Sequence, residues 1–421
     1  MVFMLNYFCT MGVVVESLAK KLNLGIDISN RYWIDAYNKA VLEPAVPYFI
    51  SKEFLDKIQD EYGILTQNYD VLISAVDLIK QDENLCLLSK ILYHLLFLEV
   101  DKNEIFEGFN FSKAQNKGKN TLGKDLFLVF PILAHIPYAY EILARRGIER
   151  GIIISSLSQL DICITEATEQ EGRPFFSNSL FLSYKSFIYL RTLRIGRLRF
   201  EIAPKSYGNF MVLEDKNGNK KVLVNDLSLH KSGNALGNLG FADKKGSFVA
   251  NILETDSYIE GYSVDEKSYL VNVSPTKFDK KEWQVIYGPT DDKIIVHIPP
   301  KDSLDRQSVL SSYERARKIF KNSFPEYDFK AFVTDSWLFA PALDMVLKEN
   351  SNIRTFRKDY IIFPARCEGL DIFHYVFNLF PKTIEEVDID NLPEDNSLRK
   401  GIKEQLKKGN YFYEFFGFYK F

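Results

Sequence analysis

The chain has 421 residues, of which 46% are hydrophobic and 14% are aromatic, and its formal net charge is −3. This length and apolar content are typical of a globular protein with two or three domains. The small negative charge gives no general attraction for nucleic acid or for an anionic membrane surface. We therefore expect neither a nucleic-acid partner nor a membrane partner.

The cysteines and histidines are few and lie far apart in the sequence. None of the four cysteines forms a CxxC pair, and the five histidines show no metal-ligand spacing. Such sparse cysteines are typical of a reducing compartment. We expect a cytoplasmic protein without a disulfide framework, a zinc module or another bound metal.

The N-terminal stretch "MVFMLNYFCTMGVVVES" is apolar but has no basic start, and its apolar run ends at Glu16. A signal peptide usually needs a basic region and a small-residue cleavage site, and a membrane helix needs about 20 apolar residues. We interpret this stretch as a buried or interface element.

The chain up to about residue 170 has a helical pattern. In "SKEFLDKIQDEYGILTQNYDVLISAVDLIK" apolar residues recur at steps of three and four, with Ser51 as the N-cap. The segment "NLCLLSKILYHLLFLEV" is apolar on most faces and is predicted to be a central buried helix. A break at Gly172–Pro174 divides a helical domain, 1–172, from a second domain, 173–421.

The second domain begins with strand patterns. In "IGRLRFEIA" the residues Leu198, Phe200 and Ile202 lie on one face and Arg199 and Glu201 on the other. Further along, "FMVLEDKNGNKKVLVND" predicts a hairpin, because its Asn-Gly pair suits a tight turn. This hairpin lies in a turn-rich insertion at about 205–290.

After the insertion, strands and helices alternate. The strand "KIIVHI" precedes a long helix, "FKAFVTDSWLF" is the next strand, a helix opens at Pro341, and "YIIFP" is a further strand. The aromatic tail "GNYFYEFFGFYKF" suits a strand that lies in the core or in a homodimer contact. The order predicts an α+β protein, a helical domain followed by a mixed sheet flanked by helices.

Two loops were candidates for binding phosphate. The glycines of "SGNALGNLG" do not have dinucleotide-binding spacing, and no helical pattern follows them, so we interpret this segment as a flexible loop. The junction at 297–305 joins a strand to a helix start, where free N–H groups suit a phosphate. Lys301 and Ser303 could assist there, whereas Asp302 and Asp305 would cap the helix and repel a phosphate.

Four side chains near strand ends are candidates for proton transfer. His297 lies on the strand face opposite Val296, and is either a base or a core histidine. Glu201 is either a base or part of a solvated ion pair with its neighbour Arg199. Asp335 and Ser336 end another strand, a place where open sheets bind ligands.

Four segments together resemble a family of bacterial two-part proteins, with a helical N-terminal acyltransferase-associated domain and a C-terminal domain similar to the GCN5-related N-acetyltransferases. They are "RTLRIGRLRFE", "IEGYSVDE", "VHIPPKDSL" with "SSYERARKIFKNSFPEYDFKAFVTDSWLFAPAL", and "SNIRTFRKDY". In order and spacing the resemblance covers roughly 190–360. It implies a strand, "KIIVHI", whose following helix receives the pyrophosphate of coenzyme A, and a neighbouring strand that splays away to admit the donor.

The resemblance implies transfer of an acyl group from acyl-CoA to the amine of a small-molecule or peptide acceptor. The implied site residues are His297, Glu201, Asp335 and Ser336 for catalysis, and Val296, Ile298, Lys301, Ser303 and Arg357 for the donor. The alternative is a non-catalytic binding or scaffold protein with the same fold. It is favoured by the absence of the glycine-rich signature Q/R-x-x-G-x-G/A, whose place is taken by Pro299–Ser303, and by the acidic helix start.

Overall fold

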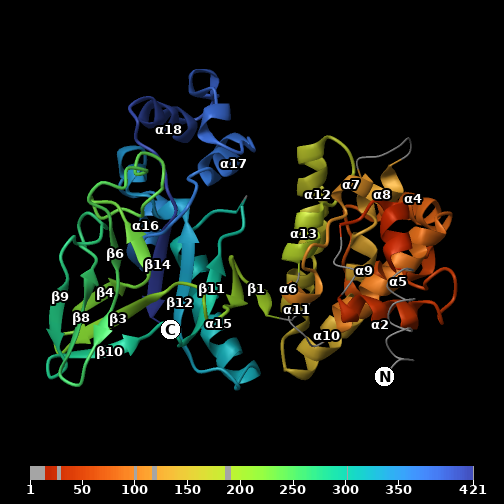
Figure 1. Ribbon diagram of the computed structural model, residues 1–421, viewed down its shortest axis with the longest axis horizontal. Coiled ribbons are helices and arrows are strands. Elements are labelled where there is room, and N and C mark those ends of the chain that lie inside the picture. Colours follow the sequence, from red (N-terminus) through yellow and green to blue (C-terminus); the bar gives the residue numbers. More distant parts are fainter. Residues whose placement is uncertain are drawn as a thin grey trace. The chain divides into compact units, whose positions relative to one another are not determined.

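The computed structural model describes residues 15–25, 30–98, 102–115, 121–184, 191–300 and 302–420. The element expected at the N-terminus lies mainly at 1–14, outside these ranges, and stays a prediction. The chain forms two compact units, Met1–Arg194 and Ile195–Phe421 (Figure 1). The division lies after the boundary expected at 172, because helix α13 (Asn178–Ser183) still belongs to the first unit.

The first unit is helical, as predicted. Side chains cap several of its helices: Ser51 accepts a hydrogen bond from the backbone N–H of Phe54, which confirms the N-cap expected from the sequence. Besides α13, its helices are α2 (Arg31–Ala40), α3 (Lys52–Tyr62), α4 (Tyr69–Lys80), α5 (Glu83–Phe97), α6 (Lys102–Ile105), α7 (Ser112–Gln115), α8 (Leu122–Leu126), α9 (Val129–Leu133), α10 (Ile136–Arg145), α11 (Arg150–Leu157) and α12 (Gln159–Glu171).

The α5 helix is the central helix of this unit, as its apolar sequence predicts. It packs against α2, α4 and α9 and buries residues on most of its surface. One stretch, Leu122–Arg145, is long and apolar enough to cross a membrane by length and composition. In this unit 72% of its most apolar window is buried and it is divided into α8, α9 and α10, a pattern that a core helix also shows.

From Thr192 onward, the described residues form two larger sheets and one small one. A mixed six-stranded sheet has the order β1-β2-β11-β12-β14-β13, and a second sheet has the order β10-β3-β4-β8-β7, with β9 paired to β8. Strands β5 and β6 form a separate pair. The strands are β1 (Thr192–Ile195), β2 (Leu198–Ile202), β3 (Phe210–Asp215), β4 (Lys220–Val224), β5 (Leu227–Leu229), β6 (Phe248–Ala250), β7 (Leu253–Glu254), β8 (Tyr258–Ser263), β9 (Thr276–Asp279), β10 (Trp283–Tyr287), β11 (Asp292–His297), β12 (Phe329–Ser336), β13 (Ile361–Pro364) and β14 (Phe415–Lys420).

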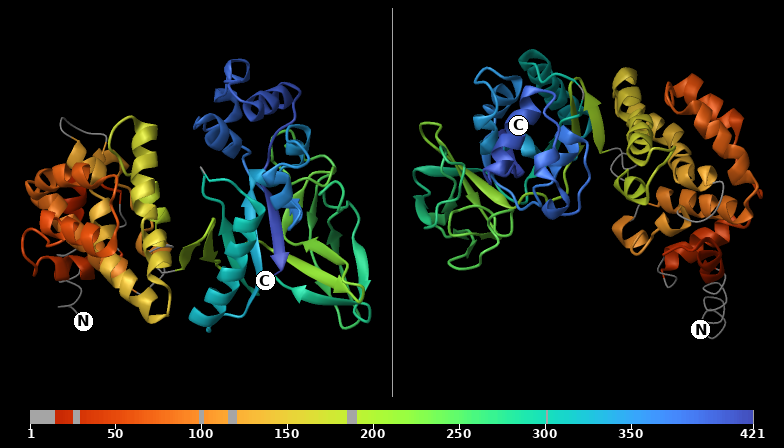
Figure 2. Two further views of the ribbon diagram at one scale, coloured as in Figure 1. Left: turned by 180° about the vertical axis from the view of Figure 1, so that it is seen from behind. Right: turned by 90° about the horizontal axis from the view of Figure 1, so that it is seen from above.

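The mixed sheet is covered on both faces, as the two views in Figure 2 show. On one face lies α15 (Arg306–Ser323), whose buried stripe includes Tyr313 and Phe320 and meets Phe200 and Phe332 of the sheet. On the other face lies the second sheet, which is the predicted insertion. Apolar residues of both sheets form one core there: Phe210, Val212, Val222, Val224, Tyr287, Ile295, Ala331, Val333, Phe363 and Phe418.

Two local predictions are resolved by the strand pairing. The hairpin is confirmed, since β3 and β4 pair antiparallel around Gly218, whose φ of +84° is the left-handed conformation that the turn requires. The aromatic tail is also a core strand, because β14 lies between β12 and β13. The helix expected to open at Pro341 is instead a short 3-10 helix, η2 (Pro341–Met345), which follows another, η1 (Trp337–Phe339).

The remaining helices lie in the C-terminal part of the unit. They include α17 and α18, drawn in dark blue in Figure 1, together with α16. Their bounds are α16 (Asn352–Arg357), α17 (Asp371–Phe377), η3 (Ile384–Glu386), η4 (Ile389–Asn391) and α18 (Ser397–Lys407).

Candidate active site

The parallel strands β11 and β12 separate before they end. Their pairing runs from Asp292 opposite Phe329 to Ile295 opposite Val333. Beyond this point β11 still pairs with β2 as far as His297, and β12 still pairs with β14 as far as Ser336. Each strand thus keeps its outer partner and loses its inner one. The backbone groups on the inner edges, which alternate along a strand, are therefore placed to bond a ligand that enters the opening.

His297 and Glu201 meet at the β11 side of this opening. In the β2–β11 register Glu201 lies opposite Ile295, so its side chain shares a face with that of His297. Nε2 of His297 lies 2.8 Å from Oε2 of Glu201, and the two side chains are 32% and 21% exposed. Because a carboxylate oxygen only accepts, Nε2 carries the hydrogen. Nδ1 of His297 then has the lone pair that a base needs.

Tyr207 and Asp335 meet at the β12 side of the opening. The hydroxyl of Tyr207, in the loop after β2, donates a hydrogen bond to Oδ1 of Asp335. Burial is the main cause that raises the pKa of Tyr207, and the charge of Asp335 adds to it. The phenol therefore keeps its proton at neutral pH and holds the carboxylate of Asp335 in place.

Further carboxyl groups gather beside Asp335. Burial first, and then the charges of Asp371, Asp335 and Glu368, raise the pKa of Glu414 to about 7. Burial also raises the pKa of Asp371. The charge of His374 acts to lower this pKa, and the charge of Asp335 acts to raise it further. A group that titrates near neutral pH can both accept and release a proton there.

The raised pKa of Glu414 predicts a pH-dependent stability difference. In the unfolded chain a glutamate titrates near its usual 4.5, so between about 4.5 and 7 the folded chain binds the additional proton. The contribution of Glu414 to stability therefore falls as pH rises through this window. We expect Glu414→Gln to be more stable than the wild type by about 1 kcal/mol at pH 8, after allowance for solvent screening, and to match it near pH 4. Urea unfolding at both pH values measures this, with exposed Glu404→Gln as the control; a difference independent of pH would contradict it.

The start of α15 borders a hollow of about 410 Å³. Arg197 lines this hollow. Its Nε donates to the backbone oxygen of Ser303 at 2.9 Å, and its Nη2 donates to that of Asp302 at 2.7 Å. The cap of the helix is Asp305, which accepts from the N–H of Ser308. The lining residues are Gly196, Arg197, Asp302, Ser303, Asp305, Ser308 and Ser311.

The predicted donor-binding residues are distributed between this hollow and the opening. Val296 lies on β11 just beyond the last residue that pairs with β12, and its side chain is buried. Ile298 lies two residues further along the chain. Ser303 lines the hollow, and its hydroxyl accepts from Asn352. Lys301 lies outside the described residues, so its role stays a prediction.

Two predicted residues have other surroundings. Arg357 lies on α16, is 5% exposed, and donates to Oδ1 of Asp344 at 2.8 Å, with the Tyr269 ring 5.9 Å away. The contacts of Arg357 are thus with Asp344 and Tyr269, and not with the residues at the ends of β11 and β12 that form the opening. The hydroxyl of Ser336 accepts from the N–H of Leu338 and caps η1 at the end of β12.

The glycine-containing loop at 233–240, interpreted from the sequence as flexible, is fixed by hydrogen bonds. The Asn238 amide donates to the backbone of Ala365 and accepts from the N–H of Cys367. At Gly237, with φ of +87°, a side chain would meet Arg366 at 3.0 Å. A glycine is therefore required for the loop to lie against Arg366.

Tyr207, Glu414 and Asp371 were missed by the sequence reasoning. The available signal for Glu414 was a single acid within a densely aromatic tail. Tyr207 lies in a loop, and nothing in the local pattern points to its partner. Among the described residues, no group of three His, Cys, Asp or Glu side chains gathers in a way that could hold a metal ion.

Comparison with known proteins identifies solved structures of the same fold and a matching family model. None of the curated proteins matches the chain. Three crystal structures share its fold: an acyltransferase in complex with decanoyl-CoA and teicoplanin (16% identity), one in complex with CoA and 10C-teicoplanin (16%), and one in complex with decanoyl-CoA (17%). Each match has a TM-score of 0.60 and covers 96% of this chain and 98% of the chain in the crystal structure.

These likenesses extend over the helical unit as well as the sheets, and at such identity they establish the fold. The family model of the GNAT-like C-terminal domain matches residues 192–419, which is more than half of the chain. The protein therefore belongs to the GNAT-like C-terminal domain family.

Proposed function

We propose that this protein is an acyl-CoA-dependent N-acyltransferase, which moves an acyl group from coenzyme A to the amine of a small-molecule or peptide acceptor. One observation carries the proposal: β11 and β12 lose their mutual pairing next to the His297–Glu201 pair. The inner strand edges offer backbone bonds to an extended thioester, and the histidine offers a base beside it. The start of α15, at the other end of the 298–305 loop, offers N–H groups for the phosphates.

The transfer needs a neutral amine and a protonated leaving thiol. An acceptor that arrives as an ammonium ion first loses one proton to water. The lone pair of the neutral amine then forms the C–N bond while the C–S bond breaks and its electron pair leaves with the sulfur. As this bond forms, Nδ1 of His297 takes the second proton from the nitrogen, and Glu201 stabilises the imidazolium that results. The proton held by His297 is returned to the thiolate, so the products are an amide and free coenzyme A.

The carboxyl groups near Asp335 suit an acceptor that arrives as an ammonium ion. The charges of Asp371 and Asp335 contribute to the raised pKa of Glu414, and that of Asp335 contributes to the raised pKa of Asp371, so the three carboxyl groups lie close together. Their negative charge attracts a cationic amine. The structural neighbours bound to teicoplanin support a peptide-like acceptor, and those bound to decanoyl-CoA support a medium-chain donor.

Release of free thiol tests the proposal. Acetyl-, octanoyl- or decanoyl-CoA is incubated with the full chain and a panel of primary amines that includes amino sugars and peptides. We expect thiol release that depends on both the enzyme and an amine, with the acylated amine detected by mass spectrometry. Thiol release without an amine, or none with any combination, would contradict the proposal.

A binding protein without catalysis is the second candidate, and the start of α15 favours it. The pKa of Asp305 is lowered, chiefly by its hydrogen bonds from Ser308, so a negative charge lies where a phosphate would bind. The side chain also takes up one of the free N–H groups of the helix start. Absence of thiol release with every acyl-CoA and amine would support this candidate, whether or not coenzyme A binds.

The charge of Asp305 gives a prediction for donor affinity. Replacing Asp305 by asparagine keeps a good N-cap but removes the repulsion of the phosphates. We expect the Kd for coenzyme A to fall about fivefold, with unchanged stability. Isothermal titration measures it, and Asp395→Asn, an exposed aspartate elsewhere, is the control. An unchanged Kd would mean that the phosphates bind away from the α15 start.

A further inference from the structure

Lys293 is a buried lysine on the same strand as His297. Its side chain is on the face that carries Ile295 and His297, since alternate residues of a strand share a face. The residue is 1% exposed. A buried ammonium is unfavourable unless its hydrogen-bond donors are satisfied, so such a residue calls for an explanation.

The ammonium of Lys293 joins two loops. Nζ donates to the backbone oxygen of Lys205 at 3.1 Å and to that of Pro289 at 2.9 Å. It also lies 5.6 Å from the centre of the Tyr287 ring, an attractive cation–π arrangement. The first loop follows β2, and the second precedes β11.

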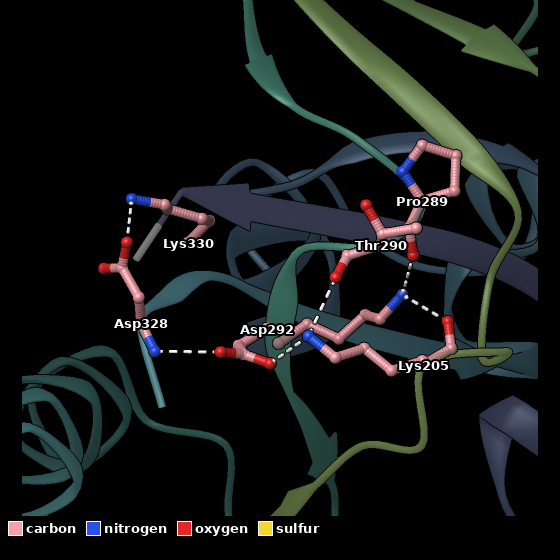
Figure 3. Close-up of polar contacts among 7 residues, drawn as sticks. Lys205, Pro289, Thr290, Asp292, Asp328 and Lys330 are labelled. Carbon is pink, nitrogen blue, oxygen red and sulfur yellow. Dashed lines mark hydrogen bonds and ion pairs between the residues drawn. The ribbon is translucent and has the colours of Figure 1, made fainter. Parts of the chain in front are cut away.

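A second lysine joins the same two loops from the solvent side. Nζ of Lys205 donates to the backbone oxygen of Thr290 at 2.9 Å and to the carboxylate of Asp292 (Figure 3). The other oxygen of Asp292 accepts from the N–H of Asp328 at 2.9 Å. The loop after β2 is thus fixed by a buried lysine and an exposed one.

This loop carries Tyr207 to the opening. The N–H of Tyr207 donates to the backbone oxygen of Pro204 at 3.0 Å, which closes a turn around Lys205. The Tyr207 ring packs edge-on against Phe416, with 5.7 Å between centroids, and its hydroxyl bonds Asp335. The place of the Tyr207 hydroxyl therefore depends on the turn that Lys293 holds.

We propose that Lys293 is a positioning residue: its buried ammonium fixes the turn at 204–207 and thereby holds the Tyr207 hydroxyl on Asp335 at the mouth of the opening. The consequence for acyl transfer rests on the proposed function. The positioning itself does not, because it concerns contacts within this chain.

The charge on Lys293 makes this arrangement sensitive to pH. Burial first, and then the charge of Lys205, lower the pKa of Lys293 to about 8, against the opposing charges of Asp291 and Asp292. Above that pH the amine is neutral, and its hydrogen bonds to the two backbone oxygens weaken. Tyr287 on β10 also faces Lys293, and an ion pair of Asp328 with Lys330 lies beside Asp292.

Hydrogen–deuterium exchange of the backbone amides at 203–208 tests the proposal directly. At pH 7 we expect Lys293→Met to raise their exchange about tenfold or more. Lys330→Met, at a partly exposed lysine near the same loops, should leave it unchanged. In the wild type, exchange corrected for its intrinsic rate should rise as pH passes about 8, a result that needs no folded variant. Unchanged protection in Lys293→Met, or a flat wild-type profile, would overturn the proposal.

Kinetics then test the link to catalysis. Lys293→Met should lower kcat about tenfold to hundredfold, with the KM for acyl-CoA within about twofold of the wild type. Tyr207→Phe should add little loss in the double variant, because both changes remove the same hydrogen bond. Independent, multiplicative losses would overturn the link. If the wild type transfers no acyl group, the proposed function fails, while the exchange data still decide whether Lys293 positions the turn.

Discussion

Replacing His297 by glutamine should lower kcat/KM for acyl transfer by about 10²- to 10⁴-fold, the usual contribution of a positioned base. Glutamine still donates a hydrogen bond to Glu201 but has no group that takes a proton from an amine. The Kd for acyl-CoA should stay within about twofold of the wild-type value, because the proposed donor contacts are the backbone edges and the α15 start rather than the imidazole. Steady-state kinetics and isothermal titration measure the two quantities.

A companion variant separates catalysis from packing. Glu201→Gln leaves the imidazole in place but removes the charge that stabilises the imidazolium, so we expect a smaller loss than in His297→Gln. In the double variant the losses should not multiply, since the two residues act as a unit. Full activity of His297→Gln would show that another group is the base, with Glu414 the next candidate because burial and nearby charges raise its pKa to about 7.

Replacing Phe418 by alanine should destabilise the protein by about 3–5 kcal/mol. Phe418 is 2% exposed on β14 and lies between the two sheets, with ring centroids 5.3 Å from Tyr287 and 6.1 Å from Phe210. Truncation leaves a cavity that these rings only partly fill. Equilibrium unfolding in urea, followed by tryptophan fluorescence and circular dichroism, measures the change.

The matched control for Phe418 is Phe380→Ala, because Phe380 is an aromatic residue of the same unit that is 46% exposed. A change within about 0.5 kcal/mol is expected there. Equal effects of the two substitutions would contradict the placement of the aromatic tail as a core strand. A large effect of Phe418→Ala alone would support it.

The spacing of apolar residues predicted most helices and strands, because buried positions recur at a regular interval along each element. The long helix predicted after "KIIVHI" is α15, which buries Val309, Tyr313 and Phe320, and the predicted alternation around Phe200 is that of β2. The prediction of a longer helix from Pro341 was wrong, because these residues form only the short 3-10 helix η2. Local patterns predict which face is buried better than they predict where an element ends.

The candidate site was predictable only in part. His297 and Glu201 were candidates because each is polar in an apolar strand, and the register of β2 and β11 brings them together. Tyr207, Glu414 and Lys293 join the site through contacts between segments far apart in the sequence, which a local pattern does not encode. Arg357 was a candidate from the resemblance, and its pairing with Asp344 depends on how η2 and α16 pack.

Binding of decanoyl-CoA to the full chain is the first measurement to make. We expect one molecule to bind per chain, and at 100 times the Kd the ligand should stabilise the folded chain by about 2.7 kcal/mol, seen as a rise in Tm. Free coenzyme A should also bind, since the phosphates and pantetheine supply most of the proposed contacts. No binding and no change in Tm with either ligand would contradict the claim that the opening between β11 and β12 receives an acyl donor.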